Sequence, residues 1–136
     1  DQVAVGEWIS KHVKKNSTVA TIRLGGISYQ AKNQIFWDLL GLTDPEQARF
    51  IAEGKKNILS SPVIKRNPDI IARVAPPKTN VTVKNYEYLQ WLDKNYTKVN
   101  SFKQGNWGSF DIWVDKSKKR SILNKEYFEN RTQNKK

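Results

Sequence analysis

The sequence predicts an α/β protein with three layers: a mainly parallel sheet, helices on both faces, and an antiparallel hairpin at the carboxy-terminal edge. Short apolar runs at residues 19–22, 35–40 and 69–74 alternate with segments of helical spacing. Strands separated by helices favour parallel pairing with right-handed crossovers. The last apolar run, at residues 110–114, alternates in period two, which is typical of a hairpin strand at a sheet edge.

The first half of the chain carries clear helix signals. Apolar side chains over residues 5–13 are spaced for one helix face, and His12 lies in that pattern as a helix-surface or core-edge residue. Gly25-Gly26 follows the first strand. Glycine permits backbone angles and close approaches that a side chain would forbid, which is typical of the connection from a strand to a helix.

A further helix is expected over residues 45–53, ended by Gly54. Asp44 can cap its free N–H groups and Pro45 fits its first turn. Thr43 with Glu46, or Asp44 with Gln47, has the spacing of a capping box.

The second half predicts one helical turn, a long helix and a hairpin. Ser61-Pro62 begins the turn, and residues 76–80 form a loop. Aromatic and leucine side chains at helical spacing predict a helix over residues 85–96, followed by a strand at 97–103 and a turn at 106–108. We therefore divide the chain into one α/β domain, residues 1–116, and a loosely attached basic tail, residues 117–136.

Composition excludes several kinds of site. The 136 residues include no cysteine and one histidine, which argues against thiolate chemistry, sulfur-rich zinc sites, histidine-pair metal sites and a Ser-His-Asp triad. Gly25-Gly26 lacks the third glycine of a dinucleotide fingerprint. We expect no metal, no cofactor and no catalytic residue in this chain.

The net charge of +11 admits two anionic partners. Nucleic acid is disfavoured, because the lysines and arginines are scattered and no nucleic-acid module is recognisable. Juxtamembrane basic groups contribute about 1 kcal/mol each near an anionic leaflet, so lipid headgroups or lipid phosphate are possible partners. A basic surface that is simply solvated has as much weight as the two anionic partners together.

Three elements carry a resemblance to a known family. They are Gly25 to Tyr29, Asp38 to Pro45 with the sequence DLLGLTDP, and Pro68-Asp69-Ile70-Ile71, preceded by the helix that contains Trp8. This pattern resembles the carboxy-terminal soluble domain of bacterial multi-spanning membrane glycosyltransferases, related to protein mannosyltransferases and lipid A aminoarabinose transferases. The likeness covers the first half well and the end only loosely.

The resemblance implies an accessory extracytoplasmic domain of an enzyme that moves a sugar from a polyprenyl-phosphate donor. The family's catalytic carboxylates lie in loops of the membrane part, so this chain would be a non-catalytic fragment whose partner is the membrane-embedded part of the same polypeptide. The implied location is the extracytoplasmic face of the bacterial inner membrane. Many members have a Gly-His-Lys-like element where this chain has Gly54-Lys55-Lys56-Asn57, so the role of that histidine does not carry over.

Two observations agree with a detached domain. Mean hydropathy is −0.72, and no apolar run approaches the roughly 20 residues that span a bilayer. The chain begins at Asp1 and contains no methionine, so we expect a processed or excised piece whose anchor precedes Asp1.

Two other function classes stay open: a stand-alone module that binds a sugar, nucleotide or anionic polymer, and a small basic nucleic-acid-binding protein. The candidate ligand or interface residues are Tyr29, Asp38, Asp44, Lys55 and Lys56. Asp38 would face the ligand crevice at the carboxyl end of a parallel strand, whereas Asp44 is expected to be a helix cap.

Overall fold

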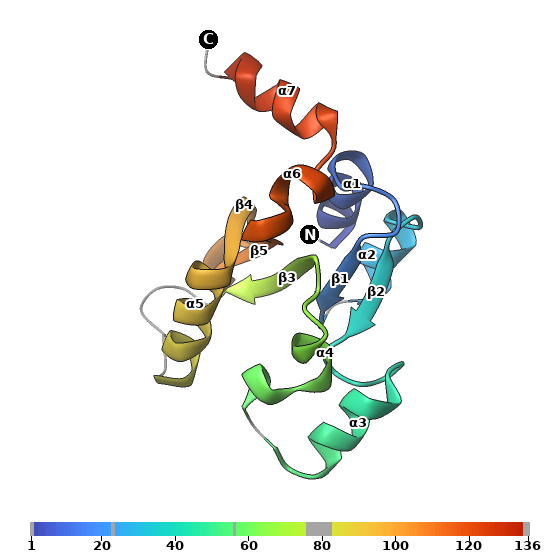
Figure 1. Ribbon diagram of the computed structural model, residues 1–136, viewed down its shortest axis with the longest axis vertical. Helices are drawn as coiled ribbons and strands as arrows, with labels where there is room; N and C mark the ends of the chain where they lie inside the picture. Colours follow the sequence, from blue (N-terminus) through green and yellow to red (C-terminus); the bar gives the residue numbers. More distant parts are fainter. Residues whose placement is uncertain (1, 23, 56, 76–82, 135–136) are drawn as a thin grey trace.

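A computed structural model describes residues 2–22, 24–55, 57–75 and 83–134 as a five-stranded mixed sheet with helices packed against it (Figure 1). The strands are β1 (Thr18–Thr21), β2 (Ile35–Asp38), β3 (Ile70–Ala75), β4 (Tyr96–Lys103) and β5 (Ser109–Asp115). Their order across the sheet is β2-β1-β3-β5-β4.

The sheet is parallel on one side and antiparallel on the other. Strand β1 pairs in parallel with β2 and β3, whereas β5 pairs antiparallel with both β3 and β4. The predicted α/β class and the edge hairpin are therefore confirmed. The mainly parallel three-layer arrangement is not confirmed, because β5 of the hairpin lies directly beside β3 along that strand's whole length.

Up to residue 116 the described helices lie close to the predicted positions, and two more lie in the segment that was predicted as a loose tail. The helices are α1 (Gln2–His12), α2 (Leu24–Gln30), α3 (Pro45–Ala52), α4 (Pro62–Lys65), α5 (Val83–Asn95), α6 (Lys119–Ile122) and α7 (Lys125–Asn134), with short 3-10 turns η1 (Ile58–Ser60), η3 (Gly105–Trp107) and η4 (Lys116–Lys118). The predicted loop at residues 76–80 lies outside the described residues.

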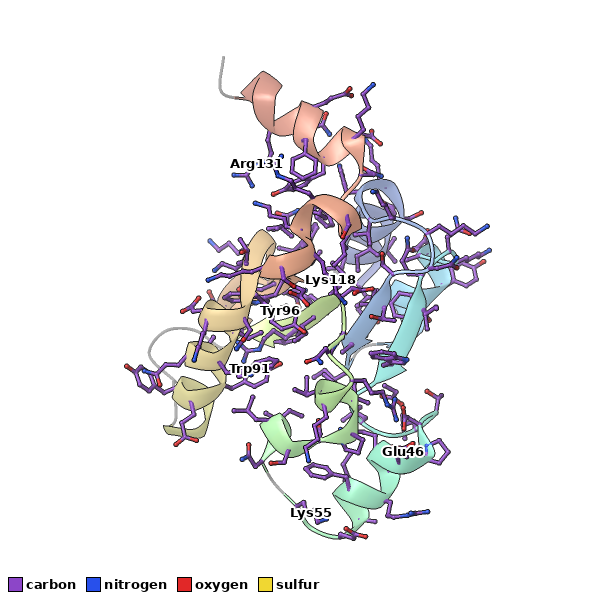
Figure 2. All side chains as sticks on the ribbon, viewed as in Figure 1. Glu46, Lys55, Trp91, Tyr96, Lys118 and Arg131 are labelled. Atoms are coloured by element: carbon purple, nitrogen blue, oxygen red, sulfur yellow. The ribbon has the colours of Figure 1, made fainter. Side chains whose placement is uncertain are left out.

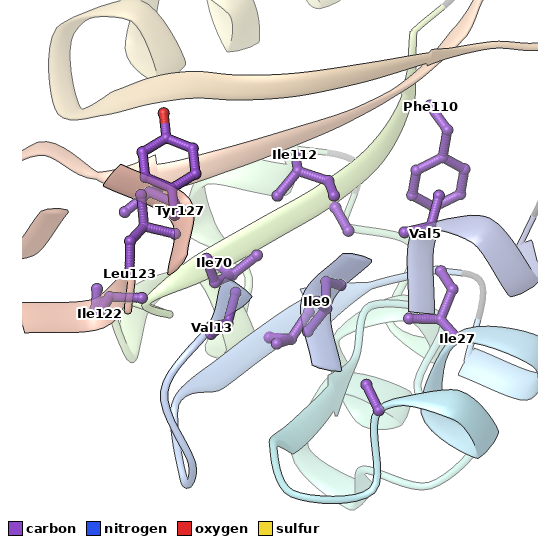
Figure 3. Packing of buried hydrophobic residues seen from close by; sticks show 14 residues of the cluster. Val5, Ile9, Val13, Ile27, Ile70, Phe110, Ile112, Ile122, Leu123 and Tyr127 are labelled. Atoms are coloured by element: carbon purple, nitrogen blue, oxygen red, sulfur yellow. The ribbon is translucent and has the colours of Figure 1, made fainter. Parts of the chain in front are cut away.

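Two groups of buried side chains use alternate positions along the strands. The larger cluster contains Ile70, Ala72 and Ile112 together with side chains of α1, α2 and the carboxy-terminal segment (Figure 3). The second cluster contains Ile71 and Trp113 with side chains of α4 and α5. Because neighbouring strand residues point to opposite faces, the two clusters cover opposite sides of the sheet.

The segment expected to be a loose tail contributes to the larger cluster. Ile122, Leu123 and Tyr127 are all at least 95% buried. The Lys14 N–H donates to the Ile122 carbonyl at 2.8 Å, which ties this segment to the end of α1. The core therefore continues past residue 116, while α7 extends to one end of the molecule (Figure 1).

Close packing of α1 on α2 accounts for one glycine of the Gly25-Gly26 pair. A Cβ on Gly26 would lie 2.9 Å from the Gln2 Cβ, and a Cβ on Gly6 would lie 2.7 Å from the Ile27 carbonyl oxygen. A Cβ on Gly25 would meet nothing within 4 Å, so packing explains Gly26 alone.

None of the helices within the described ranges has both the length and the apolar character that a bilayer crossing requires.

Candidate functional site

Asp38 ends β2 and fixes the loop that follows it. Its side chain is 1% exposed. One carboxylate oxygen accepts the Leu40 N–H at 2.9 Å, and the other accepts the Thr43 N–H at 3.0 Å. Parallel register places Asp38 at the carboxyl end of its strand, as predicted, but the carboxylate turns into its own loop.

Gly41 and Gln47 hold this loop against α3. Gly41 has a φ of 75°, and a Cβ there would lie 2.6 Å from the Ala48 backbone nitrogen, so the position requires glycine. The buried Gln47 amide donates to the Leu39 carbonyl at 3.0 Å and accepts the Val63 N–H at 3.2 Å. The loop after β2, helix α3 and helix α4 are thereby joined.

Asp44 is the N-cap of α3, as predicted, and also forms an ion pair. Its carboxylate accepts the Gln47 N–H at 3.1 Å and both arms of the Arg66 guanidinium, at 2.5 and 3.1 Å. These hydrogen bonds from Arg66 lower the pKa of the Asp44 carboxyl, and Asp44 in turn raises the pKa of Arg66. Sequence reasoning found the cap but missed Arg66, which lies 22 residues further along the chain.

Within the described residues, neither Tyr29 nor Lys55 forms a hydrogen bond or ion pair with Asp38 or Asp44. Tyr29 is 68% exposed on α2, with the Lys32 ammonium 5.0 Å from its ring centre. Lys55 is exposed beyond the end of α3, where it forms an ion pair with Glu53 at 3.0 Å. Lys56 lies outside the described residues.

The loop after β2 presents two leucines to solvent. Leu40 is 51% exposed and Leu42 is 83% exposed, although the backbone between them is fixed by Asp38 and Gly41. Ile51, 44% exposed, follows Ala48 by about one turn on the helix that Gly41 contacts. We call the described part of residues 39–66 the α3–α4 lobe; it lies below the carboxyl ends of β1 and β2 (Figure 1).

A shallow hollow of about 560 Å³ lies between α3, η1 and α4. Its charged lining residues are Glu46, Arg49, Glu53, Lys55, Lys65 and Arg66. Glu46 and Lys55 are marked on this lobe in Figure 2. Arg66 is 3.5 Å from Glu46 as well as bound to Asp44, and Lys55 is paired with Glu53, whereas no ion pair of Arg49 or Lys65 is found within the described residues.

A second hollow, of about 520 Å³, was not predicted. Trp91, Lys94 and Asn95 at the end of α5 line it together with Asn67 and residues 115–118. The spacing of Trp91 and Lys94 marks one side of a helix, but residues 115–118 join them only through the antiparallel pairing of β4 and β5. Sequence alone therefore gave no signal for this site.

We call the connection from Asp38 to Asp44 the β2–α3 corner. Both of these carboxylates already accept several hydrogen bonds, so they are suited to positioning the loop between them. Within the described residues, no three histidine, aspartate or glutamate side chains converge to hold a metal ion.

Comparison with known proteins identifies one family. Searches of curated proteins and of solved structures each found no match. Residues 1–124 match the model of a domain of unknown function, DUF8728. That match spans both the β2–α3 corner and the hollow beside Trp91, and the chain is therefore a member of the DUF8728 domain family.

Proposed function

We propose that this chain is the accessory extracytoplasmic domain of a membrane glycosyltransferase that takes its sugar from a polyprenyl-phosphate donor. The catalytic centre would lie in the membrane part of the same polypeptide, at the extracytoplasmic face of a bacterial inner membrane. The motifs at Gly25 to Tyr29, Asp38 to Pro45 and Pro68 to Ile71 support this proposal by resemblance.

One observation carries the structural argument: a fixed loop exposes Leu40 and Leu42. Exposed apolar groups gain free energy by leaving water, at roughly 25 cal/mol per Å² of buried apolar surface. A loop already held by Asp38, Gly41 and Gln47 loses little conformational entropy when it docks. Such a loop is suited to an apolar partner, and the membrane-embedded part of the transferase is the partner that we assign to it.

The hydrogen bonds that the Asp38 and Asp44 carboxylates accept support a structural role for this domain rather than a catalytic one. Asp38 and Asp44 are the acidic residues of the segment Asp38 to Pro45, and both accept backbone N–H groups that fix the β2–α3 corner. Asp44 is also held by Arg66, which keeps it ionised. A general acid or base must reach the substrate to give or take a proton, and these carboxylates are already engaged by the loop and by Arg66, so both residues serve better as supports.

Lipid phosphate remains a candidate partner of Lys55. Its ion pair with Glu53 is exposed on both sides, and such pairs contribute only about 0 to 1 kcal/mol, so a headgroup can replace Glu53 at small cost. Arg49 and Lys65, both exposed, would add positive charge on the same lobe.

The test uses the complete gene product that contains this chain, expressed in bacterial membranes. The double change Leu40→Ser plus Leu42→Ser should reduce sugar transfer from a polyprenyl-phosphate donor at least tenfold. The domain's thermal unfolding should change little, because both side chains are exposed. Tyr86→Ser on α5, which removes another exposed apolar group, is the matched control. Unchanged transfer in the leucine variant, or transfer by the isolated chain, would contradict the proposal.

A further inference from the structure

The hollow beside Trp91 lies where β3 begins and β5 ends, which is the opposite end of the strands from the β2–α3 corner. Asn67 precedes β3, Asp115 ends β5 and residues 116–118 follow it, and the two strands pair so that Ile70 lies opposite Val114. Figure 2 shows Trp91, Tyr96 and Lys118 around the space between α5 and the start of β3. Its volume, about 520 Å³, is within the roughly 300 to 1,000 Å³ of small-molecule sites.

The lining carries excess positive charge. Lys94, Lys116 and Lys118 all line the hollow, and Asp115 is the one carboxylate among the described lining residues. The Asp115 carboxylate accepts the N–H and hydroxyl of Ser117, at 3.0 and 2.7 Å. Without a ligand, the ammonium groups of these lysines repel one another. An anion in the hollow would reduce that repulsion, so its binding is favoured.

The three lysines differ in how they are held. Lys116 donates to the Asp93 carbonyl near the end of α5, which fixes its position. Lys118 is 3.5 Å from Asp69, whose other oxygen is committed to the Thr18 N–H. No hydrogen bond or ion pair of the exposed Lys94 ammonium is found within the described residues, so it is available to a ligand.

Trp91 supplies an apolar wall. Its ring lies 5.3 Å from the Tyr96 ring and 6.1 Å from the Tyr88 ring, so the indole is fixed from two sides. The Tyr96 hydroxyl donates to the Pro68 carbonyl at 2.6 Å, which fixes Tyr96 in turn. A rigid aromatic surface contributes contact area at low entropic cost.

Two amides complete the lining. Asn95 donates to the Trp91 carbonyl at 2.8 Å, which leaves its side-chain oxygen as an acceptor. Asn67 has a φ of 55°, and its backbone N–H donates to the Ile64 carbonyl at 3.1 Å, so the backbone of this residue is fixed. Amides that both donate and accept match hydroxyl groups, whereas ammonium groups match phosphate or carboxylate.

We propose that this hollow binds an anionic sugar, that is, a saccharide carrying a phosphate or a carboxylate. The ring packs on Trp91, the hydroxyls contact Asn67 and Asn95, and the acidic group contacts Lys94 and Lys118. This assignment does not rest on the proposed membrane role, because the hollow and the exposed leucines are at opposite ends of the sheet.

The experiment titrates the ¹⁵N-labelled chain with glucose 1-phosphate, glucuronate, glucose and inorganic phosphate, and follows backbone amide shifts by NMR. Glucose 1-phosphate and glucuronate should move the amides of residues 91–96 and 115–118 in a saturable manner. Glucose and phosphate alone should bind at least tenfold more weakly. Adenosine monophosphate is added as a competitor of a different class.

Variants assign the binding to the lining. Lys94→Gln plus Lys118→Gln should weaken binding of glucose 1-phosphate at least tenfold, while Lys65→Gln plus Lys125→Gln, which changes two exposed lysines elsewhere, should leave it unchanged. Equal binding by the first variant, equal affinity for phosphate alone, or tighter binding of adenosine monophosphate would each overturn the assignment. Sugar transfer by the complete enzyme is a separate readout, so the two proposals can fail independently.

Discussion

Replacing Asp44 by alanine should destabilise the protein by about 2 to 3 kcal/mol. Loss of an N-cap costs about 1 kcal/mol, and loss of charge-assisted hydrogen bonds to Arg66 costs a further 1 to 2 kcal/mol. The second figure is reduced for solvent screening because Arg66 is 29% exposed, although Asp44 is only 11% exposed. The midpoint of urea unfolding at pH 7 measures the change.

Asp44→Asn separates the two contributions to this loss, because it keeps a capping acceptor and should lose only the part due to charge. Glu53→Gln is the control: it breaks an exposed ion pair with Lys55 and should cost less than about 1 kcal/mol. Asp44→Ala within 0.5 kcal/mol of the parent would refute the reasoning.

The pH dependence has a defined sign. Arg66 lowers the Asp44 pKa in the folded state below the ordinary 3.8, so the folded state binds fewer protons than the unfolded state in this range. The stabilisation is fully present above the ordinary pKa and is lost as pH falls through the lower, folded value. Asp44→Asn should therefore flatten the acid limb of the stability curve, and an identical acid limb would count against the Asp44–Arg66 coupling.

Two further predictions concern a glycine and a tyrosine. Gly41→Ala should cost at least about 1 to 2 kcal/mol by urea unfolding and more than Gly54→Ala, because both have φ above 70° but only Gly41 would place a Cβ against α3; equal costs would contradict the close approach. Burial raises the pKa of Tyr88 to about 12, from the ordinary 10.0, despite the nearby Arg73 charge. The folded state holds this proton more tightly, so stability present below pH 10 should fall by about 2 kcal/mol as pH rises to 12, relative to Tyr88→Phe. A constant difference between the two proteins over that range would contradict it.

Local signals predicted local structure. The cap at Asp44, the proline in the first turn of α3 and the hairpin at β4–β5 are specified by neighbouring residues, and all three are found. The pairing of β5 with β3 was not predictable, because periodicity identifies a strand without choosing its partner. The Arg66–Asp44 ion pair joins residues 22 positions apart, and the hydrogen bond from the Val63 N–H to the buried Gln47 side chain joins residues 16 positions apart. No spacing rule specifies contacts over such distances in the sequence.

Asp38 shows why a correct position did not identify a role. The prediction placed it at the carboxyl end of a parallel strand, and register agrees, but a carboxylate there can face a ligand or its own loop. The observed bonds to Leu40 and Thr43 select the loop. If docking of Leu40 and Leu42 requires that loop geometry, Asp38→Asn should impair transfer by the complete enzyme through the loop as well as lower stability. In that case the Asp38 variant and the leucine variant should both impair transfer, and only the first should shift the unfolding midpoint. A loss of transfer on Asp38→Asn with an unchanged midpoint would instead give the carboxylate a direct role in the reaction.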